Sequence, residues 1–81
     1  MTEKTFRDLG FSKIYKKCEI SEEIYHYYRL DIGDIIICSN RSDMAEVTGP
    51  EAYIMDSKDI IIKGAGDLED IVTILQRNLI F

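Results

Sequence analysis

Apolar side chains recur every three or four positions near the end of the chain, the pattern of an amphipathic helix. Asp67 stands where a carboxylate can accept the free N–H groups of a first helical turn, and Glu69 and Asp70 suit the positive end of the helix dipole. We therefore predict a helix over residues 67–78 that packs on a core. The residues of its apolar stripe are Leu68, Ile71, Val72, Leu75 and Leu79.

Shorter runs of β-branched and aromatic residues, separated by turn residues, predict antiparallel strands upstream of this helix. In the last hairpin we expect Met55 opposite Ile60, which would place Tyr53 on the same face as Ile62. Before the first strand, residues 5–11 predict a short helix that ends at Gly10. The predicted strands cover residues 12–20, 24–30, 35–38, 52–55 and 60–63, with a short extended segment at 44–47.

A run of strands followed by a helix indicates the α+β class. We expect one domain over residues 1–81, with an antiparallel meander of four to five strands. A short N-terminal helix would precede the sheet, and the C-terminal helix would pack on one face. A small closed barrel is the competing architecture, because residues 32–37 resemble the glycine–aspartate turns that precede strands in OB-like and SH3-like barrels.

Alternation along residues 24–30 separates two groups of side chains. Tyr25 and Tyr27 point to one face, beside Ile36 and Cys38 if the second and third strands pair. One helix can cover only one face of a sheet. The uncovered face would then carry tyrosines and isoleucines, the composition of an interaction surface. In the alternative, the sheet curls and covers this face itself.

The net charge of −5 conceals an asymmetry: residues 1–18 carry +3 and the rest of the chain carries −8. An acidic body disfavours broad contact with nucleic acid, because such binding needs clustered lysine and arginine. It suits an inhibitor or nucleic-acid mimic that occupies a basic protein surface. The candidate residues of this acidic surface are Asp56, Asp59, Asp67, Glu69 and Asp70.

Catalytic chemistry has few candidate residues. His26 is the only histidine and lies among tyrosines, so we expect a packed side chain rather than a base. We expect Cys18 and Cys38 to be reduced thiols. Two thiols and one distant histidine do not form a zinc ligand set. We therefore expect no enzyme activity, no cofactor and no metal site.

No apolar run approaches the length of about 20 residues that spans a bilayer, and the first residues lack the layout of a signal peptide. The expected location is the cytoplasm, without membrane contact.

The opening residues 4–11, KTFRDLGF, the charged strands after them and the closing residues 67–71, DLEDI, give the chain a recognisable layout. This layout resembles short uncharacterised proteins of Gram-positive phages and prophages. The resemblance implies an accessory role in a phage or mobile-element setting and assigns no functional residue.

These observations predict a small non-enzymatic protein that acts by protein–protein interaction, with a basic or nucleic-acid-binding protein as the partner. A homodimer is expected as well, with Tyr25 or Tyr27 near the contact. The alternative function is a small barrel that binds single-stranded nucleic acid through Lys13, Lys16 and Lys17 beside the tyrosines.

Overall fold

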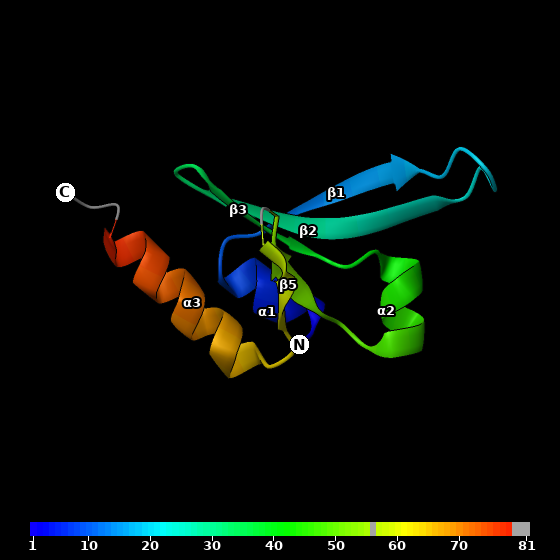
Figure 1. Cartoon of the computed structure of the whole chain (residues 1–81). Helices are drawn as coiled ribbons and strands as arrows, with labels where there is room; N and C mark the ends of the chain where they lie inside the picture. Colours follow the sequence, from blue (N-terminus) through cyan, green and yellow to red (C-terminus); the bar gives the residue numbers. More distant parts are fainter. Residues whose placement is uncertain (56, 79–81) are drawn as a thin grey trace.

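The structure, a computed structural model, describes residues 1–55 and 57–78, without the side chains of Lys58 and Asp59. Helices and strands follow in the order shown in Figure 1. The helices are α1 (Glu3–Asp8), α2 (Ser42–Thr48) and α3 (Ala65–Asn78). The strands are β1 (Ser12–Lys17), β2 (Ile24–Ile32), β3 (Ile35–Ser39), β4 (Ala52–Ile54) and β5 (Ser57–Ile62).

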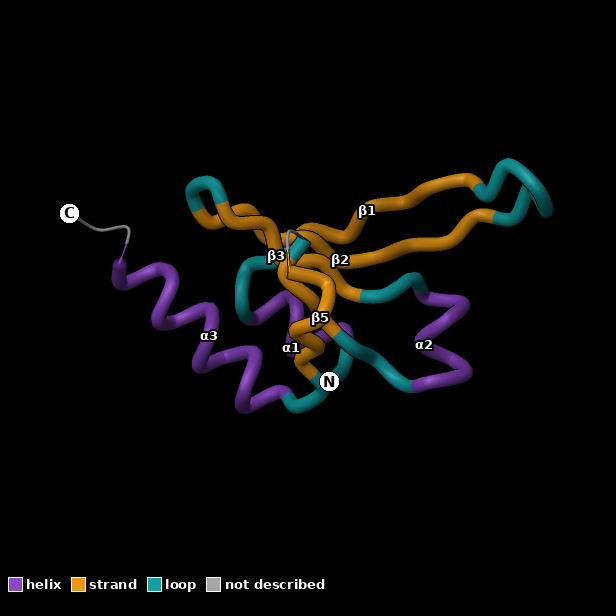
Figure 2. The backbone as a smooth tube through the Cα atoms, viewed as in Figure 1, coloured by secondary structure: helices purple, strands orange, loops and turns teal. Residues whose placement is uncertain are grey.

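The five strands form one antiparallel sheet in the order β1-β2-β3-β4-β5. Neighbours in sequence are therefore neighbours in space, as expected for a meander, and the predicted α+β layout is confirmed. β1 and β5 lie at the two edges of this order, so the described strands form an open sheet rather than the competing closed barrel. Figure 2 shows the long β1–β2 hairpin extending beyond the other strands.

All three helices lie on one side of the β1–β2–β3 part of the sheet (Figure 1). The core forms on this side, where the ring of Phe6 stacks on that of Tyr28 at a centroid distance of 4.7 Å. We call this side the covered face. Its buried cluster contains Phe6, Phe11, Tyr28, Ile32, Ile37, Ala52, Ile62, Leu68 and Val72.

α1 closes one end of the core as predicted. The Thr2 hydroxyl accepts the backbone N–H of Thr5, and the Thr5 hydroxyl accepts that of Thr2, so the two residues form a capping box. Gly10 has a φ of 91°, a conformation that suits glycine, and it separates α1 from β1.

α3 begins at Ala65, two residues before the predicted start, so Asp67 lies in the first turn and is not the residue before the helix. Leu68 and Val72 are buried, as predicted. Ile71 and Leu75 are only partly buried, because they pack at the margin of the core and not inside it. Leu79, the last residue of the predicted stripe, lies outside the described residues.

The segment predicted to be extended, residues 44–47, is helical and belongs to α2. That prediction was wrong because the local hydrogen bonds favour a helix. The Asp43 carboxylate accepts the backbone N–H of Met44, and the Thr48 hydroxyl donates to the Met44 carbonyl oxygen. Gly49 then ends the helix with a φ of 87°.

The predicted register of the last hairpin was also wrong. Tyr53 lies opposite Ile61 and Ala52 opposite Ile62, because the pairing is irregular between Tyr53 and Ile54. A shift of one residue moves side chains to the other face of a sheet. Ala52 and Ile62 therefore join the core, while Tyr53 and Ile61 lie on the opposite face.

Candidate functional site

The face of the sheet turned away from the core, called the open face below, is defined by the register of the strands. Tyr25 and Tyr27 lie on it with Ile36 and Cys38, as predicted, while Tyr28 lies on the covered face. Across the five strands, the described residues of the open face are Ser12, Ile14, Lys16, Tyr25, Tyr27, Arg29, Asp31, Ile36, Cys38, Tyr53 and Ile61.

Apolar and aromatic groups on the open face remain in contact with solvent. Tyr25, Tyr27 and Tyr53 are half-buried, and Ile61 is 53% exposed. Met55, just after β4, is 43% exposed, and its backbone N–H donates to the carbonyl oxygen of Ile36. Tyrosine and methionine are enriched where proteins bind one another, so the composition of this face fits a protein contact.

Two of the three cations beside these tyrosines are paired with carboxylates. Arg29 holds Asp31 through Nε and Nη2 at 2.7 and 3.2 Å. Arg41 holds Asp43 in the same way at 3.1 and 2.8 Å. Each guanidinium keeps the pKa of its aspartate below the ordinary value. Among the open-face cations described, Lys16 is the one without a recorded carboxylate partner.

Arg41 also connects the open face to the end of the β1–β2 hairpin. Its guanidinium carbon lies 3.9 Å from the centroid of the Tyr25 ring, a cation–π contact that fixes the ring. The polar groups around the Cys18 thiol are the Ser21 hydroxyl, the backbone N–H groups of Ser21 and Ile20, and the Arg41 guanidinium. These donor groups, those of Ser21 first, lower the pKa of the Cys18 thiol to about 7 because they stabilise the thiolate.

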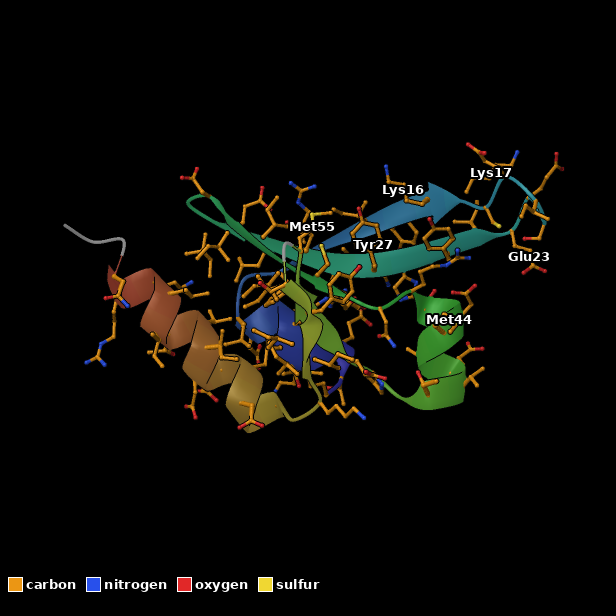
Figure 3. All side chains as sticks on the ribbon, in the orientation of Figure 1. Lys16, Lys17, Glu23, Tyr27, Met44 and Met55 are labelled. Atoms are coloured by element: carbon orange, nitrogen blue, oxygen red, sulfur yellow. The ribbon has the colours of Figure 1, made fainter. Side chains whose placement is uncertain are left out.

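A groove of about 460 Å³ borders the open face between α2 and the β4–β5 hairpin. Met44 of α2 lines one wall, and Tyr53 and Ile61 line the other. Figure 3 labels Met44 on α2. The complete lining is Asn40, Arg41, Met44, Thr48, Glu51, Tyr53 and Ile61.

A second cavity, of about 300 Å³, lies on the covered side between α1, α2 and β2. Ser39 and Ser42 use their hydroxyl oxygens to accept the backbone N–H groups of Tyr28 and His26, so these side chains support the sheet. The His26 ring makes edge contacts with Tyr15 and Tyr28. This agrees with the predicted packed histidine and places it on the face opposite Cys38.

The acidic residues do not join the aromatic ones. Asp67, Glu69 and Asp70 are exposed on α3, which lies on the covered side of the sheet (Figure 1). Within the described part of the chain, no ion pair involves these three carboxylates. Asp56 and the side chain of Asp59 lie outside the described residues, so the predicted acidic surface is described only in α3.

The lysines of β1 are divided between the two faces by strand alternation. Lys16 lies on the open face, opposite Tyr25, whereas Lys13 pairs with Tyr28 on the covered side. Lys13 is bound to the Glu3 carboxylate at 3.2 Å and therefore is not available to a phosphate group. The structure does not bring Lys13, Lys16 and Lys17 together into one basic surface beside the tyrosines.

Three residues of the site were not identified from the sequence. Tyr53 was grouped with Ile62 through the register error, and Met44 was assigned to a short extended segment. Arg41 lies in a predicted loop, where no periodic pattern indicates which ring its guanidinium will contact. The Arg-x-Asp spacing at 29–31 and 41–43 is the one signal that could have indicated the ion pairs.

Comparisons of the chain with protein-family models, curated proteins and solved structures find no match. No cluster of three or more potential metal-ligating side chains occurs among the residues that the structure describes. Within the same residues, none of the helices has the length and apolar composition needed to cross a membrane.

Proposed function

We propose that the protein is a non-enzymatic interaction module that binds another protein through the open face of its sheet. The observation that carries this proposal is the contrast between the two faces. One face is buried under helices, and the other presents half-buried tyrosines and exposed Met55 and Ile61. A surface of this kind loses unfavourable contact with water when a partner covers it.

The charges near the open face support a protein partner over a nucleic acid. Arg29 and Arg41 are neutralised by bidentate aspartates, which leaves Lys16 as the cation free to meet a phosphate. Tyr25 is already stacked under Arg41, so its ring is less accessible to a base. Binding of single strands combines stacking with several phosphate contacts, and this face offers few of the latter.

The positions of the nucleophilic and basic side chains support a role without catalysis. His26 contacts two tyrosine rings on the covered side. Cys38 is buried on the open side, and the recorded partners of Cys18 are Ser21, Ile20 and Arg41. A thiol nucleophile needs a base within hydrogen-bond reach, and neither cysteine has His26 among its partners.

A basic partner is the finer part of the proposal. Asp67, Glu69 and Asp70 give the start of α3 an exposed negative surface without recorded ion pairs. An inhibitor or mimic would use such carboxylates to meet the cations of a basic protein, in a phage or mobile-element setting. This surface and the open face lie on opposite sides of the sheet, so one partner would have to wrap around an edge to contact both.

Affinity capture with the wild-type chain and two matched variants tests the proposal. The wild-type chain is immobilised and exposed to a lysate of the organism that encodes it. Tyr27→Ala should abolish capture of the partner, whereas Tyr15→Ala should retain it, because Tyr15 is 62% exposed on the other face of β1. Equal capture by both tyrosine variants would contradict the open-face proposal.

The acidic surface is tested by neutralising it. A variant with Asp67→Asn, Glu69→Gln and Asp70→Asn should weaken capture of a basic partner and reduce its salt dependence. An unchanged affinity would remove the mimic while leaving the open face in place. Direct binding of labelled single-stranded DNA that weakens steeply with salt would favour the alternative of a nucleic-acid-binding sheet.

A further inference from the structure

The two edges of the sheet differ in composition. β1 forms one edge, and its exposed side chains include Lys16 and Lys17. β5 forms the other edge; it begins with Ser57, Lys58 and Asp59, and its last three residues, Ile60–Ile62, are all isoleucine. Charged residues on an edge discourage pairing with another strand, whereas an apolar edge segment such as Ile60–Ile62 favours it.

β5 is apolar on both faces near its end. Ile61 lies on the open face and is 53% exposed, while Ile60 alternates with it and is 50% exposed. Ile62 is buried in the core. Strands with apolar residues on both faces are typical of sheet interiors, where a neighbour lies on each side. The described strands provide β5 with one neighbour, β4.

We infer that β5 pairs with β5 of a second copy of the chain across a two-fold axis, so that two five-stranded sheets join into one. The isoleucines of the two strands then cover one another, and the open faces of both copies become continuous. This inference deepens the self-association expected from the sequence, but it places the contact at β5 instead of at Tyr25 or Tyr27.

A second copy is the occupant that the two edges favour. Pairing of β1 with β1 would bring the lysines of both copies together, and like charges opposite one another destabilise a strand pair. Pairing of β5 with β1 is a heterologous contact, which continues into an open chain of molecules unless it closes into a ring. Pairing of β5 with β5 forms a closed dimer of two copies. It keeps the β1 edge, with Lys16 and Lys17, out of the contact.

Mass measurement by light scattering tests the inference with a matched pair of variants. The wild-type chain should be a dimer at micromolar concentration. Ile60→Lys should reduce the mass to that of a monomer, because Ile60 is an exposed residue of β5 and the change places a charge beside the pairing edge. Ile20→Lys should remain a dimer, since Ile20 is 96% exposed in the β1–β2 turn and adds the same charge elsewhere. Circular dichroism of both variants checks that each is folded.

Hydrogen exchange of the wild-type chain gives a second measurement that needs no substitution. Amides of β5 should exchange more slowly as the protein concentration rises through the dimer range, while those of β1 should not change. A monomeric wild type, a dimer that survives Ile60→Lys, or concentration-dependent protection confined to β1 or β2 would each overturn the inference. Ile60 alternates with Ile61 and is not part of the open face, so Ile60→Lys should still bind the partner captured through Tyr27, and failure of this inference is distinguishable from failure of the proposed function.

Discussion

Tyr27 and Tyr28 are neighbours in β2, yet they lie in opposite environments. Tyr28 is 7% exposed and stacks on Phe6 in the core, whereas Tyr27 is half-buried on the open face. Strand alternation alone separates them, because successive side chains point to opposite faces. The comparison teaches that residue type does not assign an environment here: one tyrosine is packed in the core and the next is half-buried at the surface.

The two faces also differ in the role of their ion pairs. On the open face, Arg29 and Asp31 are two residues apart in one strand, so both side chains point the same way and pair. On the covered side, Lys13 is bound to Glu3 of α1 and ties the helix to the sheet. The Lys13 ammonium is the main cause that lowers the pKa of Glu3. The Arg29–Asp31 pair neutralises charge on the open face, whereas the Lys13–Glu3 pair connects α1 to β1.

The largest expected effect is on the covered side, where Leu68→Ala removes a fully buried side chain of α3. Loss of its contacts and the resulting cavity should lower the free energy of unfolding by about 2–5 kcal/mol. Ile74→Ala is the matched control, since Ile74 of the same helix is 55% exposed and should change stability by less than about 0.5 kcal/mol. Urea denaturation measures both; equal losses would mean that α3 is not docked through Leu68.

The second prediction compares two thiols. At pH 7 about half of Cys18 should be thiolate, on the order of fifteen times the fraction of an ordinary cysteine. Burial instead raises the pKa of Cys38. Iodoacetamide should therefore modify Cys18 before Cys38, as measured by mass spectrometry. The rate of modification of Cys18 should increase as the pH rises through 7 and decrease as the pH falls below 7, because the thiolate is the reactive form. Ser21→Ala should move the midpoint to higher pH; an unchanged midpoint would contradict the hydrogen-bonded thiolate.

A smaller effect is expected from the capping box of α1. Thr2→Ala leaves the first-turn N–H of Thr5 without its side-chain acceptor and should lower the free energy of unfolding by about 1 kcal/mol. Thr73→Ala is the control, because Thr73 is exposed inside α3 and no cap depends on it. A loss of the same size at Thr73 would contradict the assigned role of the cap.

Most of the fold could be predicted from the sequence, because its periodic patterns are long. The α3 stripe and the alternation in β2 each extend over several residues, so errors at single positions do not change the assignment. α2 was missed because seven residues give too short a pattern, and its stability depends on the local bonds of Asp43 and Thr48. The register of β4 and β5 was wrong because an irregularity at Tyr53 is invisible in the alternation.

The candidate site could be predicted only in part. The grouping of Tyr25 and Tyr27 with Ile36 and Cys38 followed from alternation and is confirmed. The cation–π contact of Arg41 could not be predicted, since it depends on how the chain leaves β3. The acidic residues of α3 lie away from the aromatic face because of how α3 packs on the sheet. No local sequence pattern predicts this packing.

The central claim is that the covered face maintains the fold, which leaves the open face available for the recognition role that we propose. Chemical denaturation of Tyr28→Ala and Tyr27→Ala, adjacent residues with the same change, tests it most directly. Tyr28→Ala should lower the free energy of unfolding by about 3–5 kcal/mol, as for a large core residue. Tyr27→Ala should lower the free energy of unfolding by roughly 1 kcal/mol, the usual contribution of a pair of side chains on neighbouring strands. Equal losses at the two positions would contradict the division of the sheet into a structural face and a binding face.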